Sequence, residues 1–308
     1  MRKKKLTALA MSVLCVASLA AGCGNSNGGS GSSTTSAGSS SADSGSSSQP
    51  ITVVSREDGS GTRGAFIELT GVQEKDADGN KVDNTTVDAV ISNSTEIMMT
   101  TVAGDEFAIG YSSTGSLNDT VKALTVDGVE ATPENIKDGS YTLSRPFNIA
   151  TKGKVGDLAQ DFIDYIMSAE GQKVVEENGY IASVDNAEAF QSSGAEGKIV
   201  VAGSSSVTPV MEKLSEAYKE VNEKAEIEIQ ESDSTTGMTA AADGTCDIGM
   251  ASRELEDSEK DAGLESTAIA MDGIAVIVNT KNSLSDINTD TVKGIFTGEI
   301  TDWNEVSK

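Results

Sequence analysis

The chain has 308 residues and a formal net charge of −25, with 48 Asp and Glu against 23 Lys and Arg, and it contains no histidine. This length is enough for two modest lobes, each with its own core. The acidic excess argues against nucleic acid as a partner, because binding to its phosphates relies on basic side chains. The absence of histidine removes the usual nucleophilic triads and the commonest zinc ligands. We therefore expect neither an enzyme nor a metal site, and no cofactor.

Residues 1–22 have the pattern of a bacterial secretory signal. Four basic residues at positions 2–5 precede an apolar stretch, and small residues then lead to Cys23. A cysteine directly after Ala-Gly is typical of a lipoprotein cleavage site, so we predict that Cys23 becomes the lipidated N-terminus; the alternative is a soluble secreted protein that is cut nearby. Residues 23–50 are nearly all Gly, Ser, Thr, Ala and Asn. Such a segment buries too little apolar surface to fold, which predicts a flexible tether.

Beyond the tether, strand-like and helix-like segments alternate, which predicts α/β layers with largely parallel sheets. Strands are expected at 51–55, 106–113, 198–205, 225–232, 246–252 and 267–279, and helices within 88–104, within 154–181, from near Pro209 and at 238–243. The polar stretch 186–197 is predicted to be a linker between two portions, 51–185 and 198–308.

Three of the strand-to-helix turns carry the same chemistry. Each offers hydroxyl side chains and free backbone N–H groups at a helix N-terminus, which is a natural oxyanion site. The turns contain Ser60, Gly61 and Thr62; Ser204, Ser205 and Ser206; and Ser234 to Gly237. Arg56 would add a full positive charge with a bidentate fork, and Asp58 would orient its guanidinium. Either the three turns converge on one anion, or each is a helix cap and nothing more.

Five segments together resemble the phosphate-binding proteins of ABC importers, the PstS type. They are "VVSREDGSGTRGAF", "VVAGSSSVTPVMEKLSEAYK", "DIGMASREL", "GIAVIVN" and "VKGIFTGEITDWNEV". The resemblance implies a two-lobed α/β fold of the periplasmic-binding-protein-like class (type II), with two crossover strands and a cleft that closes on dehydrated phosphate. It places Ser205 and Ser206 on a first anion loop and Ser234 on a second. Arg56, Ser60, Gly61 and Thr62 fall on a third loop, with Asp58 as the partner of the arginine.

The order of these segments departs from the family pattern. In the family, the "AGSSSVTP" loop opens the mature protein and the "TDWNEV" segment runs directly into the "VVSREDGSGT" strand, whereas here the chain ends at "TDWNEVSK". We therefore predict a circularly permuted order, with one lobe from 51–143 plus 272–308 and the other from 144–271. Permutation is tolerated where termini are exposed and close together. The competing interpretation is a rearranged product that cannot fold.

A second departure concerns the group that would accept the proton of phosphate. Where relatives commonly carry an acidic residue after "DIGMAS", this chain has Ser252 and Arg253. We assign Ser252 to the ligand site and leave Arg253 as either a second cationic contact or a surface residue. Asp233 is a candidate proton acceptor, although a solvated loop carboxylate is its alternative role.

The resemblance implies a monomeric receptor, lipid-anchored at the extracellular face of the bacterial cytoplasmic membrane, that binds inorganic phosphate and delivers it to an ABC permease. Three alternatives stay open. One is a binding protein for another tetrahedral oxyanion such as sulfate, and another is a phosphate sensor that feeds no transporter. The third, of a different class, is a phosphatase or phosphoryl-transfer enzyme.

Overall fold

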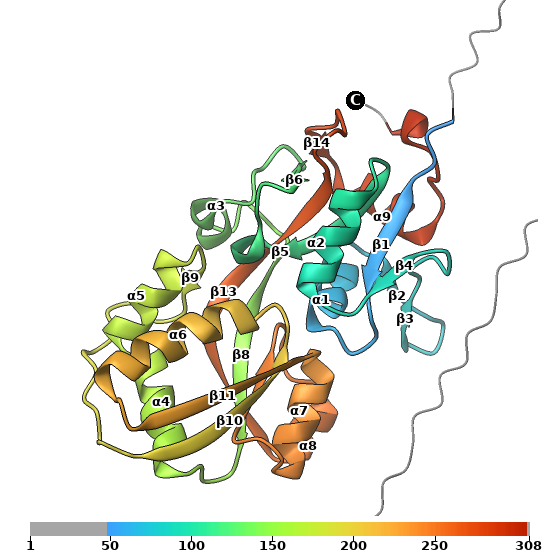
Figure 1. Cartoon of the computed structure of the whole chain (residues 1–308). Helices are drawn as coiled ribbons and strands as arrows, with labels where there is room; N and C mark the ends of the chain where they lie inside the picture. The colour runs from blue at the N-terminus through green and yellow to red at the C-terminus, as the bar shows by residue number, and fades with distance from the viewer. Residues whose placement is uncertain (1–47, 307–308) are drawn as a thin grey trace, which may run out of the picture. The chain divides into compact units, whose positions relative to one another are not determined.

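The computed structural model describes residues 48–306, which form a mixed α/β structure (Figure 1). In this part of the chain the main sheet has ten strands, in the order β11-β10-β12-β8-β13-β5-β1-β4, with β6 and β9 pairing with β13 off this path. Cys23, the predicted signal at 1–22 and most of the predicted tether lie outside the described residues. No helix within 48–306 has the length and apolar character needed to cross a membrane.

The strands of the main sheet are β1 (Thr52–Arg56), β4 (Val90–Ser92), β5 (Ala108–Ser113), β6 (Val121–Ala123), β8 (Ser144–Lys152), β9 (Ile181–Ala182), β10 (Gly197–Ser204), β11 (Ala225–Ser232), β12 (Ile248–Ala251) and β13 (Leu264–Asn279). Two small sheets pair β2 (Gln73–Lys75) with β3 (Lys81–Asp83) and β7 (Thr125–Val126) with β14 (Asp286–Ile287). The helices are α1 (Gly61–Leu69), α2 (Thr95–Gly104), α3 (Pro133–Lys137), α4 (Asp157–Ile166), α5 (Ala169–Glu177), α6 (Thr208–Val221), α7 (Ser234–Asp243), α8 (Asp257–Asp261) and α9 (Thr289–Thr297), with short 3₁₀ turns η1 (Thr114–Ser116) and η2 (Trp303–Glu305).

The two central strands of the main sheet differ from the outer ones in direction. β1 runs parallel to β4 and β5, and β10 runs parallel to β11 and β12, as the alternation of strands and helices predicts. β8 and β13 instead pair antiparallel with each other and with their outer neighbours. Figure 1 shows these two long strands side by side, running from one group of helices to the other. These two strands connect the two halves of the sheet.

Buried apolar side chains gather in two main clusters. The first core draws on residues 53–143 and 274–306, with Ile181 added. The second core draws on residues 147–270. β13 contributes Ile269 and Ala270 to the second core and the run from Ile274 to Val278 to the first. One continuous strand therefore belongs to both cores.

The segment 88–104, predicted as a helix with a loop, contains a strand before its helix. β4 lies at the edge of the sheet, where Val90 and Ile91 stand in register with Val54 and Ser55 of β1. β-branched residues favour a strand when a neighbour can pair with them. β1 supplies that neighbour, and α2 begins only at Thr95.

The two ends of the described chain lie side by side. Pro50 forms a β-bridge with Asp302, and the Trp303 backbone N–H donates to the carbonyl of Gln49 over 2.9 Å. The Ile51 backbone N–H donates to the carbonyl of Thr301 over the same distance. The strand that begins the folded body is thus an immediate neighbour of the segment that ends it.

The predicted linker has no helix or strand between residues 183 and 196. It nonetheless lies against the second core, because the ring of Phe190 packs on Tyr165 with centroids 5.2 Å apart. Asp161 of α4 accepts a hydrogen bond of 2.6 Å from the Ser193 backbone N–H. These contacts hold the segment between β9 and β10 on the protein surface.

Candidate anion-binding site

Arg56 is the last residue of β1, and its buried guanidinium reaches two other segments of the chain as well as the neighbouring Glu57. Nη2 donates to Ser205 Oγ over 3.0 Å, and Nη1 donates to Thr95 Oγ1 over 3.3 Å. Nε and Nη2 also donate to the two carboxylate oxygens of Glu57, each over 2.8 Å. The Tyr111 hydroxyl, itself buried, accepts the backbone N–H of Arg56 and so supports the end of the strand.

Around this guanidinium lie buried hydroxyl groups from several loops, which we call the hydroxyl cluster. Its members are Thr62, Thr95, Ser204, Ser205, Ser206, Ser234 and Ser252, each at most 6% exposed.

Contacts between neighbours connect the cluster into one network. Ser206 Oγ lies 2.8 Å from Thr62 Oγ1 and 3.0 Å from Thr95 Oγ1. Ser252 Oγ lies 3.0 Å from Ser204 Oγ, 3.3 Å from Thr62 Oγ1 and 3.5 Å from Ser234 Oγ. Hydroxyls can both donate and accept, so the network can reorient its hydrogen bonds around a ligand.

Local sequence explains why these groups stand at helix starts. Ser60 caps α1 through the backbone N–H of Arg63, Ser94 caps α2 through Ile97, and Asp233 caps α7 through Thr236. Capping satisfies only part of a helix N-terminus, and the remaining N–H groups and the helix dipole favour negative charge there. The site therefore brings together the starts of α1, α2 and α7 with the loop that precedes α6.

Gly61 is needed where α1 approaches the second core. A Cβ atom at this position would lie 2.5 Å from Ser234 Oγ and 2.8 Å from Ser252 Oγ. Distances this short would force the two loops apart. The adjacent turn is joined directly to the start of α7, because Gly59 accepts a hydrogen bond of 3.1 Å from the Thr235 backbone N–H.

The structure brings together most of the residues that the sequence assigned to the ligand. Arg56, Gly61, Thr62, Ser205, Ser206, Ser234 and Ser252 all lie in or against the hydroxyl cluster. Ser60 is buried beside them, and its hydroxyl accepts the Arg63 N–H over 3.3 Å as a helix cap.

The prediction that Asp58 orients Arg56 is wrong in this structure. The Asp58 side chain is 97% exposed and pairs with Arg63 over 3.0 Å. Glu57 holds the Arg56 guanidinium instead, with both oxygens. The chain turns directly after β1, and this turn directs Glu57 toward Arg56 and Asp58 toward solvent.

Asp233 and Arg253 are both engaged outside the cluster. Asp233 accepts the backbone N–H of Thr236 over 2.8 Å and the hydroxyl of the same residue over 2.6 Å. Arg253 donates to both carboxylate oxygens of Glu259, over 2.7 and 2.8 Å, and to Thr235 Oγ1 over 3.1 Å. Both side chains therefore have structural partners of their own.

Three residues at the site were missed from the sequence. Thr95 lies at the start of α2 and touches Arg56, Ser205 and Ser206. Its Ser-Thr-Glu context resembles the other helix starts, but it falls inside the segment 88–104, for which the sequence predicts only a helix with a loop. Arg145 of β8 donates to Thr62 Oγ1 over 2.9 Å. It also lies 3.2 Å from Asp272 of β13, with which it is in register. The sequence offers one weak signal for this pair, since Asp272 is the only charged residue in 267–279 and Arg145 the only one in 142–151.

Burial shapes the electrostatics of the Arg145–Asp272 pair. The pKa of Arg145 is lowered, mainly by burial. The negative charge of Asp272 opposes this shift, and the positive charge of Arg56 adds to it. Burial likewise raises the pKa of Asp272, against the effects of Arg145 and of the Ser113 and Thr114 hydroxyls.

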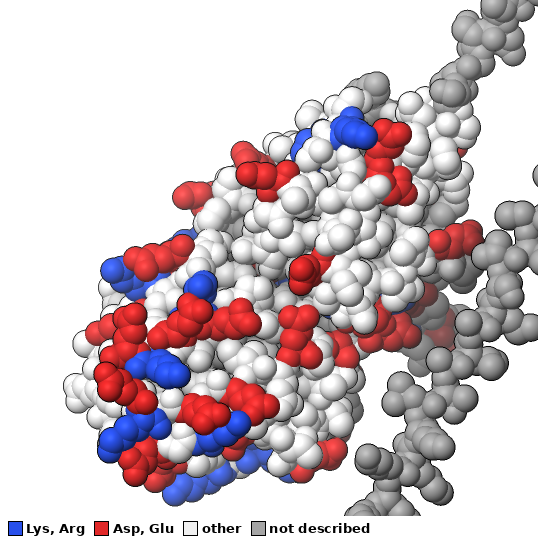
Figure 2. Space-filling model, in the orientation of Figure 1, with Lys and Arg blue, Asp and Glu red and all other residues white. Residues whose placement is uncertain are grey.

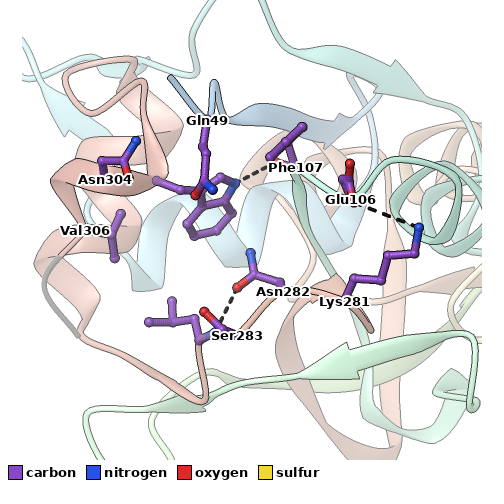
Figure 3. A pocket seen from close by; sticks show the side chains of 10 residues that line it. Gln49, Glu106, Phe107, Lys281, Asn282, Ser283, Asn304 and Val306 are labelled. Atoms are coloured by element: carbon purple, nitrogen blue, oxygen red, sulfur yellow. Dashed lines mark hydrogen bonds and ion pairs between the residues drawn. The ribbon is translucent and has the colours of Figure 1, made fainter. Parts of the chain in front are cut away.

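A separate pocket of about 490 Å³ (Figure 3) lies near the two ends of the described chain and shares no lining residue with the hydroxyl cluster. Trp303 lines it and donates its indole N–H to the Phe107 carbonyl over 2.9 Å, while Lys281 faces Glu106 at 3.9 Å. The pocket has no convergent set of buried hydroxyls among its lining residues. Within 48–306 no group of three or more His, Cys, Asp or Glu side chains is placed to hold a metal ion.

Comparisons with known proteins agree with this architecture. A family model described as a PBP superfamily domain matches residues 32–170 and 188–308. Phosphate-binding protein PstS 2 of Streptococcus agalactiae is 54% identical over 308 residues, which cover 100% of this chain and 99% of that protein. The protein of the same name from Streptococcus pneumoniae is 47% identical over 84% of this chain and 88% of its own length.

A solved structure supports the same relationship. The crystal structure of a phosphate ABC transporter, phosphate-binding protein from Streptococcus pneumoniae TIGR4 has a TM-score of 0.67 and 46% identity, covering 84% of this chain and 100% of that one. The α/β fold of the periplasmic-binding-protein-like class, predicted from the sequence, is confirmed. The chain therefore belongs to the PBP superfamily and, within it, to the family of PstS phosphate-binding proteins.

Proposed function

We propose that the chain binds inorganic phosphate in the hydroxyl cluster and delivers it to an ABC importer, without catalysing a reaction. The observation that carries the proposal is that buried hydroxyls from four helix-start loops form one network, two of whose members contact the guanidinium of Arg56. A tetrahedral oxyanion presents oxygens in several directions and needs donors around it. The names of the streptococcal relatives point to the same ligand and transporter class.

The strength of binding follows from the number of such contacts. A hydrogen bond to a charged group contributes about 1.5–3 kcal/mol. Several of them, less the costs of desolvation and ordering, are sufficient for a micromolar dissociation constant, about −8 kcal/mol. The many acidic side chains on the surface in Figure 2 do not prevent the binding of an anion in the buried site. Exposed charges more than about 8 Å away are screened at physiological salt, so the groups that line the site dominate its electrostatics.

The proposed mechanism is closure of two lobes around the ligand. One lobe comprises 51–143 plus 272–308, and the other comprises 144–271, in line with the first and second cores. Arg56 and Thr62 come from the former and Ser205 and Ser234 from the latter. We place the hinge in the crossover strands β8 and β13, near 144–149 and 270–277, since β13 belongs to both cores and β8 pairs with it where it passes from one core to the other.

We further propose that the segment order is a circular permutation of the usual family order. The ends of the folded body are neighbours, as the Pro50–Asp302 bridge shows, so a chain joined there and cut at 186–197 would keep the same contacts. The match to the Streptococcus agalactiae relative runs along nearly the whole of both chains, so that protein shares the order. A shared order at this identity argues against a rearranged product that cannot fold.

The proposed location is the extracellular face of the cytoplasmic membrane, as a monomer anchored through Cys23. The support is the signal pattern at 1–22 and the Gly/Ser-rich composition of 23–50, which would hold the folded body off the membrane. A radiolabelled fatty acid incorporated by the wild-type chain but not by Cys23→Ala would test this directly.

Isothermal titration calorimetry tests the ligand. The protein is unfolded and refolded by dialysis to remove bound phosphate, then titrated with phosphate and separately with sulfate. We expect micromolar or tighter phosphate binding. Phosphate should also raise the thermal midpoint, because a free phosphate concentration a hundredfold above Kd adds about 2.7 kcal/mol to the free energy of unfolding.

Sulfate is the second candidate ligand because of one observation. Within the described chain, no carboxylate is hydrogen-bonded to a member of the hydroxyl cluster, and the one carboxylate beside it, Glu57, is held by Arg56. A carboxylate there would repel a fully ionised anion. Tight sulfate binding with negligible phosphate binding would replace the phosphate proposal.

A further inference from the structure

Arg145 is a buried cation whose surroundings do not use its hydrogen-bonding capacity. Its side chain is 2% exposed, and Nη2 donates to Thr62 Oγ1 over 2.9 Å. Nε and Nη1 have no hydrogen-bond partner within residues 48–306. The face of the guanidinium lies 5.3 Å from the ring centroid of Phe147, a favourable cation–π contact that uses no N–H group. Unpaired N–H donors on a buried charged group lower the stability of the folded protein, so their presence requires an explanation.

The ion pair with Asp272 accounts for only part of this arrangement. Asp272 is fully buried and uses Oδ1 to accept hydrogen bonds from Ser113 and Thr114, over 2.9 and 3.0 Å. Its Oδ2 lies 3.2 Å from Arg145 Nη2 without hydrogen-bond geometry. The carboxylate thus compensates the charge of Arg145 but leaves the rest of its fork available.

A continuous path of hydroxyls connects Arg145 to Arg56. From Arg56 the contacts run through Ser205 and Thr95 to Ser206, over 3.0, 3.3 and 3.0 Å. They continue through Thr62 to Arg145, over 2.8 and 2.9 Å. The hydroxyl cluster therefore has a guanidinium at each end, one from β1 and one from the crossover strand β8.

Two like charges around one set of hydroxyls repel each other unless an anion lies between them. Burial lowers the pKa of Arg145, Asp272 raises it in part, and the charge of Arg56 acts in the same direction as burial. An oxyanion in the cluster would relieve the repulsion and would give acceptors to the unused donors of Arg145. A neutral ligand could accept from those donors but would not relieve the repulsion.

We propose that Arg145 is a second anion-binding guanidinium of this site, presented by the crossover strand, and that it shares a tetrahedral oxyanion with Arg56. The inference rests on the proposed function and deepens it. Because β8 lies in the proposed hinge, the ligand would contact both lobes and one of the strands that join them. Occupancy of the site would then stabilise one relative position of the lobes directly.

The test must separate a ligand contact from a purely structural ion pair. The double variant R145Q/D272N replaces the pair with neutral groups of similar size and keeps an oxygen that can accept from Ser113 and Thr114. The single variant D272N removes the carboxylate but keeps the guanidinium. Each is freed of bound phosphate, checked by circular dichroism and thermal unfolding, and titrated with inorganic phosphate by calorimetry.

We expect R145Q/D272N to bind phosphate at least about tenfold more weakly than the wild type, because one charge-assisted contact is lost. D272N should bind at least as tightly as the wild type, because removal of a negative charge frees Arg145 for the anion. Wild-type affinity in the double variant would overturn the inference while leaving the phosphate proposal intact. If the wild type itself bound no phosphate, the proposed function would fail first.

A conservative variant covers the case in which the double variant does not fold. R145K keeps the charge but loses the planar fork, and we expect it to lose several-fold in phosphate affinity. D272N should lose none. Equal losses in R145K and D272N would show that only the integrity of the pair matters, and the inference would be abandoned.

Discussion

Arg56 and Ser205 are 149 positions apart in the chain, yet Nη2 of the arginine donates to the serine hydroxyl over 3.0 Å. Arg56 ends β1 and Ser205 follows β10, and these strands lie on opposite sides of the β8–β13 pair in the sheet. Their side chains meet because both strands end beside the same group of helix N-termini. The contact joins the parts of the chain that form the first and second cores.

Replacement of Arg56 by alanine should weaken phosphate binding by roughly tenfold or more, because the variant loses a charge-assisted contact. Calorimetry on the phosphate-free protein measures the effect. Arg253→Gln is the control, since Glu259 holds the Arg253 side chain outside the cluster. The phosphate affinity of this variant should stay within about threefold of the wild type. Equal losses in the two variants would contradict the assignment of Arg56.

Gly61→Ala should weaken phosphate binding by at least about tenfold, because the added methyl group would meet Ser234 and Ser252 at 2.5 and 2.8 Å and keep the loops apart. Gly64→Ala is the matched control on the same helix, where a Cβ meets nothing within 4 Å. This control should bind normally and gain about 0.5–1 kcal/mol of stability from its higher helix propensity. Unaltered binding in Gly61→Ala would show that the close approach is not needed for the bound state.

Thr95→Val removes one hydroxyl and nearly preserves the shape of the side chain. We expect a loss of phosphate affinity of about threefold to thirtyfold, because Arg56, Ser205 and Ser206 each lose a partner. Thr101→Val provides a control on the same helix, since its hydroxyl bonds only the Ile97 carbonyl on the exposed side. Titration of both variants would reveal whether the effect belongs to the cluster or to α2 in general.

Asp161 should govern part of the stability of the protein toward acid. Burial raises its pKa, but hydrogen bonds from Tyr218, Ser193 and Ser192 outweigh this and leave the pKa below the ordinary value. A carboxyl group with a lowered pKa in the folded state contributes stability above its unfolded pKa of about 3.9, and this contribution is lost as the pH falls through the folded value.

Urea unfolding at a series of pH values measures this contribution. Asp161→Asn should lower the free energy of unfolding by about 1–3 kcal/mol at pH 7 and flatten its fall below about pH 4. Asp164→Asn, on the exposed side of the same helix, should do neither. A wild-type pH dependence in Asp161→Asn would mean that another group controls acid unfolding.

Local features of the sequence were enough to predict much of the fold. β-branched runs before glycine-rich turns marked β1 and β10, and Ser, Thr and Asp before apolar stretches marked the helix starts. β4 was missed because three residues of a strand carry little signal without the neighbour that pairs with them. Thr95 was lost with it, since its role depends on α2 beginning at that residue.

The amino-acid sequence alone determined the alternation of strands and helices, the capped helix starts and the types of side chain available for an anion, because each of these depends on residues a few positions apart. Only the tertiary structure decided that Glu57 and not Asp58 holds Arg56, and that Arg145 lies between Thr62 and Asp272. Those contacts depend on the direction of a turn and on the register of β8 with β13. The geometry of the site was therefore settled by the packing of distant segments, whose hydrogen bonds exist only once the sheet has formed.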